Sequence, residues 1–234
     1  MTQSALGVQA VEVGLQIRPL LRRVYLWMTA GVLLTAIVAL LTVTTPALHG
    51  LLVNPFVVWG ALIGELVLVV VLSAAIHRLS PAAAAAIFIA YAGLLGFSLS
   101  GIFFLYDLGS ITLTFVSASA LFGMMTVVGF VTRADLTKLG TYLTIGLIGL
   151  ILTMLLNFLV RSSTLDLMVS LAGVAIFTGL TAYDTQKIGR LAKDPRLQDE
   201  GAMLGRLSIL GALTLYLDFI NLFLFLLRLL GRRR

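Results

Sequence analysis

The chain has 234 residues, of which 60% are apolar and only 11% are charged, and its mean hydropathy is +1.09. Soluble domains carry about 25% charged residues, so this composition excludes an ordinary soluble protein. The chain has no cysteine, which excludes disulfide frameworks and thiolate metal sites, and its two histidines are too few for a histidine-built zinc site. The net charge is +6, but the basic residues lie between hydrophobic runs. They therefore indicate membrane orientation and anionic lipid, and no nucleic-acid partner is expected.

The N-terminal segment, residues 1–23, is predicted to lie in the cytoplasm. Its basic cluster of Arg18, Arg22 and Arg23 precedes the apolar run Val24–Val43. This run is longer than the apolar core of a secretory signal peptide, so it predicts a first membrane span that stays in the protein.

Seven segments meet the length rule for a membrane span, which is about 20 mostly apolar residues. They are Val24–Val43, Phe56–Ile76, Ala82–Leu105, Ile111–Val131, Leu139–Val160, Leu165–Tyr183 and about Gly211–Leu230. We expect helices, because an open strand edge in lipid would leave backbone groups unpaired. The sequence thus predicts one all-α integral membrane domain, residues 24–230, followed by a basic tail, residues 231–234.

The distribution of Lys and Arg predicts the orientation. With the N-terminus inside, most basic residues fall on the cytoplasmic side, including five in the charge-rich connection Lys187–Arg206. The segment Leu197–Leu210 is an expected amphipathic surface helix before the last span. The three terminal arginines disagree with this orientation, because seven spans place them outside. A six-span protein with a re-entrant last segment would keep them inside, but the last run is long enough to cross.

Three acids lie within or at the edge of the predicted spans, where an ionisable group indicates function. Asp218 shares a helix face with Thr214 and Asn221, so it is expected to point inward, although a neutral carboxyl used only for packing would also fit. Asp184 ends the sixth span, and an interfacial pair with Lys187 is its simplest structural interpretation.

The depth of Asp218 depends on where the last span begins. A start at Gly211 places it about 10 Å deep, close to Asp184, whereas a start near Leu204 places it near the midplane. Glu65 lies near the middle of the second span. Its candidate partner is Arg228, and a neutral Glu65 bonded to a neighbouring helix is the alternative.

Two motifs carry a family resemblance. The segment Tyr183-Asp184-Thr185-Gln186, followed by Leu213–Phe223, resembles the paired C-terminal signature of the Bax inhibitor-1 (transmembrane Bax-inhibitor motif) family. The segment Thr132–Gly140 is similar to the loop between the family's fourth and fifth spans, and Phe223–Arg234 looks like the prokaryotic branch. The resemblance implies six helices around a central seventh, and a pH-sensitive calcium leak in a bacterial cytoplasmic membrane.

The resemblance also implies residue roles. Asp184 and Asp218 match the family's pH-sensing aspartate pair and would contact passing calcium weakly and transiently. Glu65 and Arg228 match a closing latch, and Arg78 is a candidate basic partner of the pair. We expect a monomer without a resident cofactor, with calcium as the transported ion.

Chemistry supports the paired interpretation, because two carboxylates within hydrogen-bonding reach titrate as one unit in two steps. Three other classes of function compete with a calcium leak. An intramembrane protease is disfavoured, because Asp218 lacks the Gly-x-Gly-Asp context of aspartyl members, and no enzyme activity is expected. A proton-coupled ion exchanger remains an alternative, as does a non-transporting regulator that binds a membrane protease.

Overall fold

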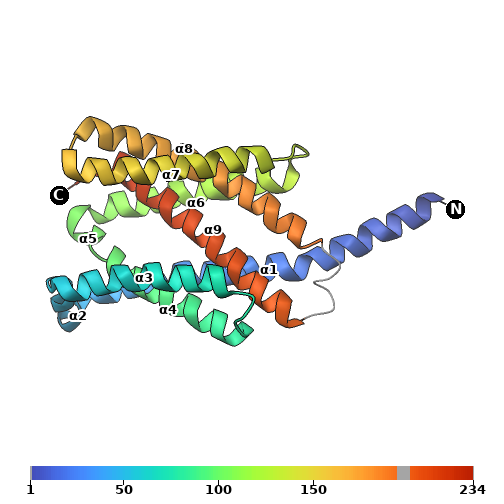
Figure 1. Ribbon diagram of the computed structural model, residues 1–234, viewed down its shortest axis with the longest axis horizontal. Coiled ribbons are helices and arrows are strands. Elements are labelled where there is room, and N and C mark those ends of the chain that lie inside the picture. The colour runs from blue at the N-terminus through green and yellow to red at the C-terminus, as the bar shows by residue number, and fades with distance from the viewer. Residues whose placement is uncertain (1, 194–200, 234) are drawn as a thin grey trace. The chain divides into compact units, whose positions relative to one another are not determined.

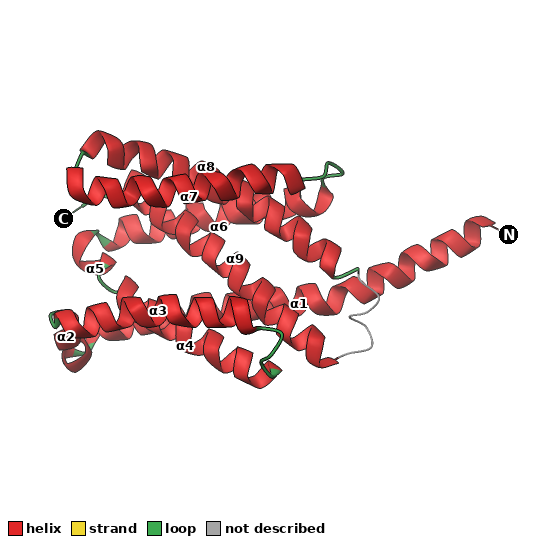
Figure 2. Cartoon of the chain, in the orientation of Figure 1, coloured by secondary structure: helices red, strands yellow, loops and turns green. Residues whose placement is uncertain are grey.

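A computed structural model describes residues 2–193 and 201–233 of the chain. Within these residues every regular element is a helix (Figures 1 and 2). The helices are α1 (Thr2–Thr44), α2 (Pro46–Leu52), α3 (Pro55–Ala75), α4 (Pro81–Leu99), α5 (Ile102–Leu105), α6 (Leu108–Val131), α7 (Thr137–Val160), α8 (Ser163–Leu191) and α9 (Gly201–Leu230).

The seven predicted spans are confirmed. Seven segments of the described chain are long and apolar enough to cross a membrane. They are Pro19–Thr44, Pro55–Ala75, Pro81–Leu105, Leu108–Val131, Thr137–Val160, Ser163–Leu191 and Gly201–Leu230. The third span combines α4 and α5.

The last helix begins earlier than the predicted start at about Gly211. It starts at Gly201 and runs without a break to Leu230. The first part of the expected surface helix, residues 197–200, lies outside the described residues. The rest, Gly201–Leu210, is continuous with the span.

Proline occurs in the first turn of three early helices. Pro46, Pro55 and Pro81 each occupy a first-turn position, where a missing N–H removes no helical hydrogen bond. Two of these starts are also capped, because the Asn54 side chain accepts from Phe56 N at 3.0 Å and Ser80 Oγ accepts from Ala83 N at 3.1 Å. These caps fix the first turns of α3 and α4 directly after short connections.

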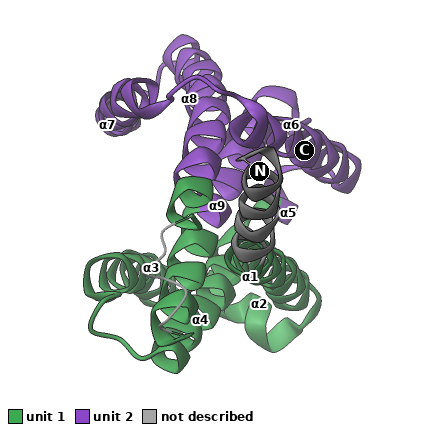
Figure 3. Ribbon diagram, turned by 90° about the vertical axis from the view of Figure 1, so that its right-hand side faces the viewer, with its two compact units in different colours: residues 1–102, 188–214 green, residues 103–187, 215–234 purple. Residues whose placement is uncertain are grey.

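The chain forms two compact units (Figure 3). The first comprises residues 1–102 and 188–214, and the second comprises residues 103–187 and 215–234. Helices α8 and α9 contribute residues to both units, so neither unit is one continuous stretch of chain. The division into an N-terminal segment, one helical domain and a basic tail stays a prediction.

The first unit packs α1 against α4 and both against the beginning of α9. Thr35 Oγ1 donates to Ala92 O at 2.8 Å, which joins α1 to α4. On α9, a Cβ atom added at Gly211 would lie 3.1 Å from Val24 of α1. The glycine therefore allows a close approach of these two helices.

The second unit packs α6 and α8 against the rest of α9. The Phe219 ring lies 5.5 Å from Phe115 and 5.6 Å from Phe122 on α6, in edge-to-face geometry. The Phe225 ring stacks on Phe177 of α8 at 5.8 Å. Among the candidate spans of the described chain, α9 has the largest buried share, 67% of its most apolar window. This agrees with the expected central position of the seventh helix.

The two ends of the second unit fix the direction of α9. Arg232, just after α9, bonds to the start of α6, because Asp107 N donates to Arg232 O and Arg232 N donates to Ser110 Oγ. Gln186, near the end of α8, instead bonds to the loop that follows α6. Arg232 and Gln186 therefore lie at opposite ends of α6. A continuous α9 between these two ends agrees with a crossing last span, while the membrane side of each terminus stays a prediction.

Candidate functional site

The structure brings the predicted aspartate pair together. Asp184 on α8 and Asp218 on α9 belong to the same unit, and their side chains hydrogen-bond to each other. Asp184 is only 9% exposed and Asp218 only 4%. A carboxylate has no donor, so a carboxyl–carboxyl hydrogen bond requires a proton on one of the two groups. The early start of α9 therefore does not separate the two acids.

The polar surroundings of the pair are sparse. Lys187 is close enough to act on the charge of Asp184, and its ammonium also lies 5.8 Å from the centre of the Tyr183 ring. Within the described chain, Asp218 Oδ2 and Thr185 Oγ1 are buried and have no hydrogen-bond partner. Asp218 Oδ2 is therefore an available acceptor within the pair itself.

Thr214 and Asn221, which share the face of Asp218, bond within their own helix. Thr214 Oγ1 donates to Leu210 O at 3.1 Å, and Asn221 Nδ2 donates to Leu217 O at 2.8 Å. Both side chains are half-buried. The polar face predicted from the sequence is present, and the carboxyl of Asp218 is its only ionisable group.

Two glycines position α8 around Asp184. A Cβ atom at Gly129 of α6 would collide with the Ala182 carbonyl oxygen and lie 2.9 Å from Thr185 Cβ. A Cβ atom at Gly140 of α7 would lie 2.5 Å from the Tyr183 ring. Helices α6 and α7 can therefore approach α8 closely only because both positions lack a side chain.

Gln186 connects the same part of α8 to the loop between α6 and α7. Its Nε2 donates to Ala134 O at 2.8 Å, and its Oε1 accepts from Leu136 N at 3.0 Å. One side-chain amide thus satisfies two backbone groups of a loop. Every residue of the Tyr183–Gln186 motif has a distinct contact, and the role of Gln186 was not evident from the sequence.

Glu65 lies in the other unit and is hydrogen-bonded to a neighbouring helix. Ser98 Oγ of α4 donates to Glu65 Oε1 at 2.5 Å, and Glu65 is buried. This is the alternative contact considered for Glu65 in the sequence. The latch between Glu65 and Arg228 would join the two units, and it stays a prediction.

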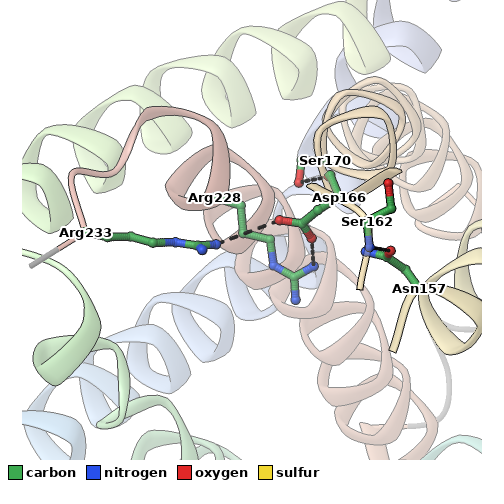
Figure 4. A network of polar contacts seen from close by, with 6 residues as sticks. All are labelled: Asn157, Ser162, Asp166, Ser170, Arg228 and Arg233. Carbon is green, nitrogen blue, oxygen red and sulfur yellow. Dashed lines mark hydrogen bonds and ion pairs between the residues drawn. The ribbon is translucent and has the colours of Figure 1, made fainter. Parts of the chain in front are cut away.

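Arg228 has an acidic neighbour that the sequence analysis missed. Its Nη1 lies 4.0 Å from Asp166 Oδ1, and Nη2 of Arg233 lies 3.8 Å from Asp166 Oδ2 (Figure 4). The Asp166 and Arg228 side chains are 39% and 36% exposed. Asp166 occupies the first turn of α8 and Arg228 the last turn of α9. The chain crosses the membrane twice between these two turns, which places them at one membrane face, and that signal could have found the contact.

The start of α6 holds the segment after α9 in place. The Ser110 side chain hydrogen-bonds to Asp107 and holds the pKa of that carboxyl below its ordinary value, with a smaller contribution from Arg232. Arg233 also donates to the Tyr106 side chain. The basic tail is therefore attached to structured residues as far as Arg233, and Arg234 lies outside the described residues.

Arg78, the possible partner of the aspartate pair, is exposed in the turn after α3. Its backbone N–H donates to Ala75 O, and the adjacent His77 carbonyl accepts from Arg206. Arg78 belongs to the first unit, so its role toward Asp184 and Asp218 stays a prediction.

Comparison with known proteins identifies the family. Residues 17–234 match the family described as "Inhibitor of apoptosis-promoting Bax1". The chain belongs to the Bax inhibitor family. This result confirms the resemblance of the two C-terminal motifs, and the match extends over nearly the entire chain.

Relatives from several bacteria support the membership. The Bax inhibitor family chain is 46% identical over 213 residues to "Inner membrane protein YbhL" of Escherichia coli (strain K12), with 91% of each chain covered. It is 42% identical over 215 residues to an uncharacterized protein of Borreliella burgdorferi, with 92% of each chain covered. It is also 42% identical over 212 residues to an uncharacterized protein of Deinococcus radiodurans, with 91% of this chain and 90% of the relative covered.

Proposed function

We propose that this Bax inhibitor family protein is a pH-sensitive calcium leak pathway of the bacterial inner membrane, gated by Asp184 and Asp218. The observation that carries the proposal is the hydrogen bond between these two buried carboxyl groups, which joins α8 to α9. The similarity to an inner membrane protein of Escherichia coli supports the location. The proposed activity is transport, with no catalytic step and no resident cofactor.

The chemistry of the pair provides a switch. One shared proton holds the two helices together through a carboxyl–carboxylate hydrogen bond. Removing this proton places two like charges in contact, whereas adding a second proton removes the charge that attracts a cation. Because the groups interact strongly, the two protonation steps belong to the pair and not to either residue.

The same oxygens suit calcium as a passing ion. Calcium prefers carboxylate and other oxygen ligands and binds tightly with six to eight of them. Two carboxyl groups supply few ligands, so they favour brief contact over retention. Within the described chain, no group of three or more His, Cys, Asp or Glu side chains could hold a metal ion.

Calcium flux in liposomes tests the proposal. The purified full chain would be reconstituted at a series of pH values, with and without an imposed proton gradient, and compared with protein-free liposomes. We expect calcium to move down its own gradient without a proton gradient, at a rate that changes with pH. The same series gives the direction of gating.

Two results would contradict a leak. Flux that requires the proton gradient would identify a proton-coupled exchanger, for which an aspartate pair is equally suitable. No calcium flux at any pH would favour a regulator that acts by binding another membrane protein, such as a protease. In either case Asp184 and Asp218 would need a different role.

A further inference from the structure

A groove lies along the first span, near its N-terminal end. Its volume is about 260 Å³, and it is lined by Arg23, Leu26, Trp27 and Ala30 of α1. The spacing of these residues places them on one face of the helix. Ala30 has the smallest side chain of the four, so it leaves the hollow beside Leu26 and Trp27.

The groove is on the outer side of α1 within its unit. The adjacent face of the helix is packed inside, where Leu20, Val24 and Met28 are buried. Leu26, by contrast, is 58% exposed. Leu26 and Ala30 therefore form an exposed apolar floor, whereas Trp27 is half-buried.

The aromatic wall of the groove is held in place. The Trp27 ring packs edge-to-face on Phe88 of α4, with 6.2 Å between ring centres and an angle of 89°. The hydrogen bond from Thr35 to Ala92 keeps α1 and α4 together further along the span. The wall next to Ala30 is thus part of the packed bundle.

A positive charge marks one end of the groove. Arg23 is exposed and lies close to the start of the span Pro19–Thr44. It forms no hydrogen bond or ion pair with any residue that the structure describes. At this depth an arginine reaches the level of the lipid phosphates, and tryptophan is also enriched there.

We propose that this groove binds one anionic phospholipid from the bilayer. The phosphate accepts hydrogen bonds from the Arg23 guanidinium, whose planar donors match phosphate oxygens, and an acyl chain lies along Leu26, Trp27 and Ala30. The charge selects an anionic lipid over a zwitterionic one, because a zwitterionic headgroup carries its own cation. The site is independent of the aspartate pair.

The chain contains its own reporter and a matched control. It has only two tryptophans, Trp27 and Trp59. Trp59 on α3 is 65% exposed, as a lipid-facing side chain would be. No Lys or Arg lies between residues 24 and 77 of the sequence. Trp59 therefore samples ordinary boundary lipid, whereas Trp27 samples the groove.

Fluorescence quenching by brominated lipids tests the site. The full chain carrying Trp59→Phe would report on Trp27, and Trp27→Phe would report on Trp59, in liposomes with increasing brominated phosphatidylglycerol or phosphatidylcholine. We expect half-quenching of Trp27 at about fivefold less phosphatidylglycerol than phosphatidylcholine, the ratio that corresponds to ~1 kcal/mol for one basic residue. Trp59 should be quenched equally by both lipids.

Arginine variants in the Trp59→Phe background distinguish lipid binding in the groove from general attraction of anionic lipid by the basic segment. Arg23→Gln should remove the preference of Trp27 for phosphatidylglycerol, Arg23→Lys should keep much of it, and Arg22→Gln should leave most of it. Equal quenching of Trp27 by the two lipids would overturn the proposal, as would an Arg22→Gln effect as large as that of Arg23→Gln. Failure of either lipid to quench Trp27 would show that the chain itself or a second copy of it covers this face, and would overturn the proposal too.

Discussion

Helices α8 and α9 meet in two polar clusters that differ in charge and in surroundings. The buried pair consists of Asp184 and Asp218, each less than one tenth exposed. The exposed network consists of Asp166, Arg228 and Arg233, whose side chains are between 36% and 66% exposed. The buried pair joins two acids, whereas the exposed network joins one acid to two arginines. The two clusters also differ in access to water.

Water access decides what each cluster can do. Exposed ion pairs are screened by solvent and contribute little to stability, so the exposed network can break and reform at small cost. Buried carboxyl groups cannot both ionise cheaply, so the buried pair must change its protonation to change its state. A switch is therefore expected at the buried pair and an adjustable attachment at the exposed network.

The largest effect should come from the packing that supports the buried pair. Gly129→Ala places a methyl group against the backbone of α8 at Ala182, and we expect a loss of about 1–3 kcal/mol, as for other overpacked positions. Gly123→Ala on the same helix is the control, because no atom lies within 4 Å of its added Cβ. Thermal unfolding in detergent measures both. Equal melting temperatures would show that α6 does not constrain α8 here.

An effect of at most similar size is expected at the attachment of α8 to the loop after α6. Gln186→Leu removes two hydrogen bonds, each worth about 0.5–1.5 kcal/mol. Gln186→Glu keeps the acceptor for the Leu136 amide and loses only the donor to Ala134. Hydrogen exchange at the Leu136 amide should therefore accelerate strongly in Gln186→Leu and little in Gln186→Glu. The same acceleration in both variants would contradict the assigned contacts.

The smallest effect is expected at the exposed network. Asp166→Asn should loosen the segment after α9 by less than about 1 kcal/mol, and high salt should mimic it, because both weaken the same exposed ion pairs. A cysteine added after Arg234 is the only thiol in the chain and allows labelling rates to be measured. Salt should raise the rate in the wild type and add little in Asp166→Asn. A salt effect of full size in the variant would place the attachment elsewhere.

The sequence predicted the fold better than it predicted the contacts between distant residues. Hydropathy gives seven spans because each exceeds the length needed to cross lipid, and the structure confirms them. Hydropathy did not locate the start of the last helix. The charged connection Lys187–Arg206 lowers the local hydropathy, although its last part and the residues up to Leu210 are helical from Gly201 on. Composition alone therefore left the depth of Asp218 open.

Pairings between distant residues were harder to predict. The resemblance of two motifs brought Asp184 and Asp218 together, and the structure shows that they are hydrogen-bonded. The contact of Arg228 with Asp166 was not predicted, and the bond of Glu65 to a neighbouring helix was an alternative without a named partner, because hydropathy gives no helix order or rotation. The family resemblance assigned Arg228 to Glu65, and that latch stays a prediction, whereas Asp166 in the first turn of α8 lies beside Arg228 in the structure.

The most direct test of the central claim is the pH at which the calcium leak changes by half. It would be measured in matched liposomes for the wild type, Asp184→Asn and Asp218→Asn, with Asp166→Asn as the control acid on α8. Because the protonation steps belong to the pair, we expect either change in the pair to flatten the pH dependence, and Asp166→Asn to leave the midpoint in place. A wild-type midpoint that survives Asp218→Asn unshifted would show that the buried pair is not the sensor.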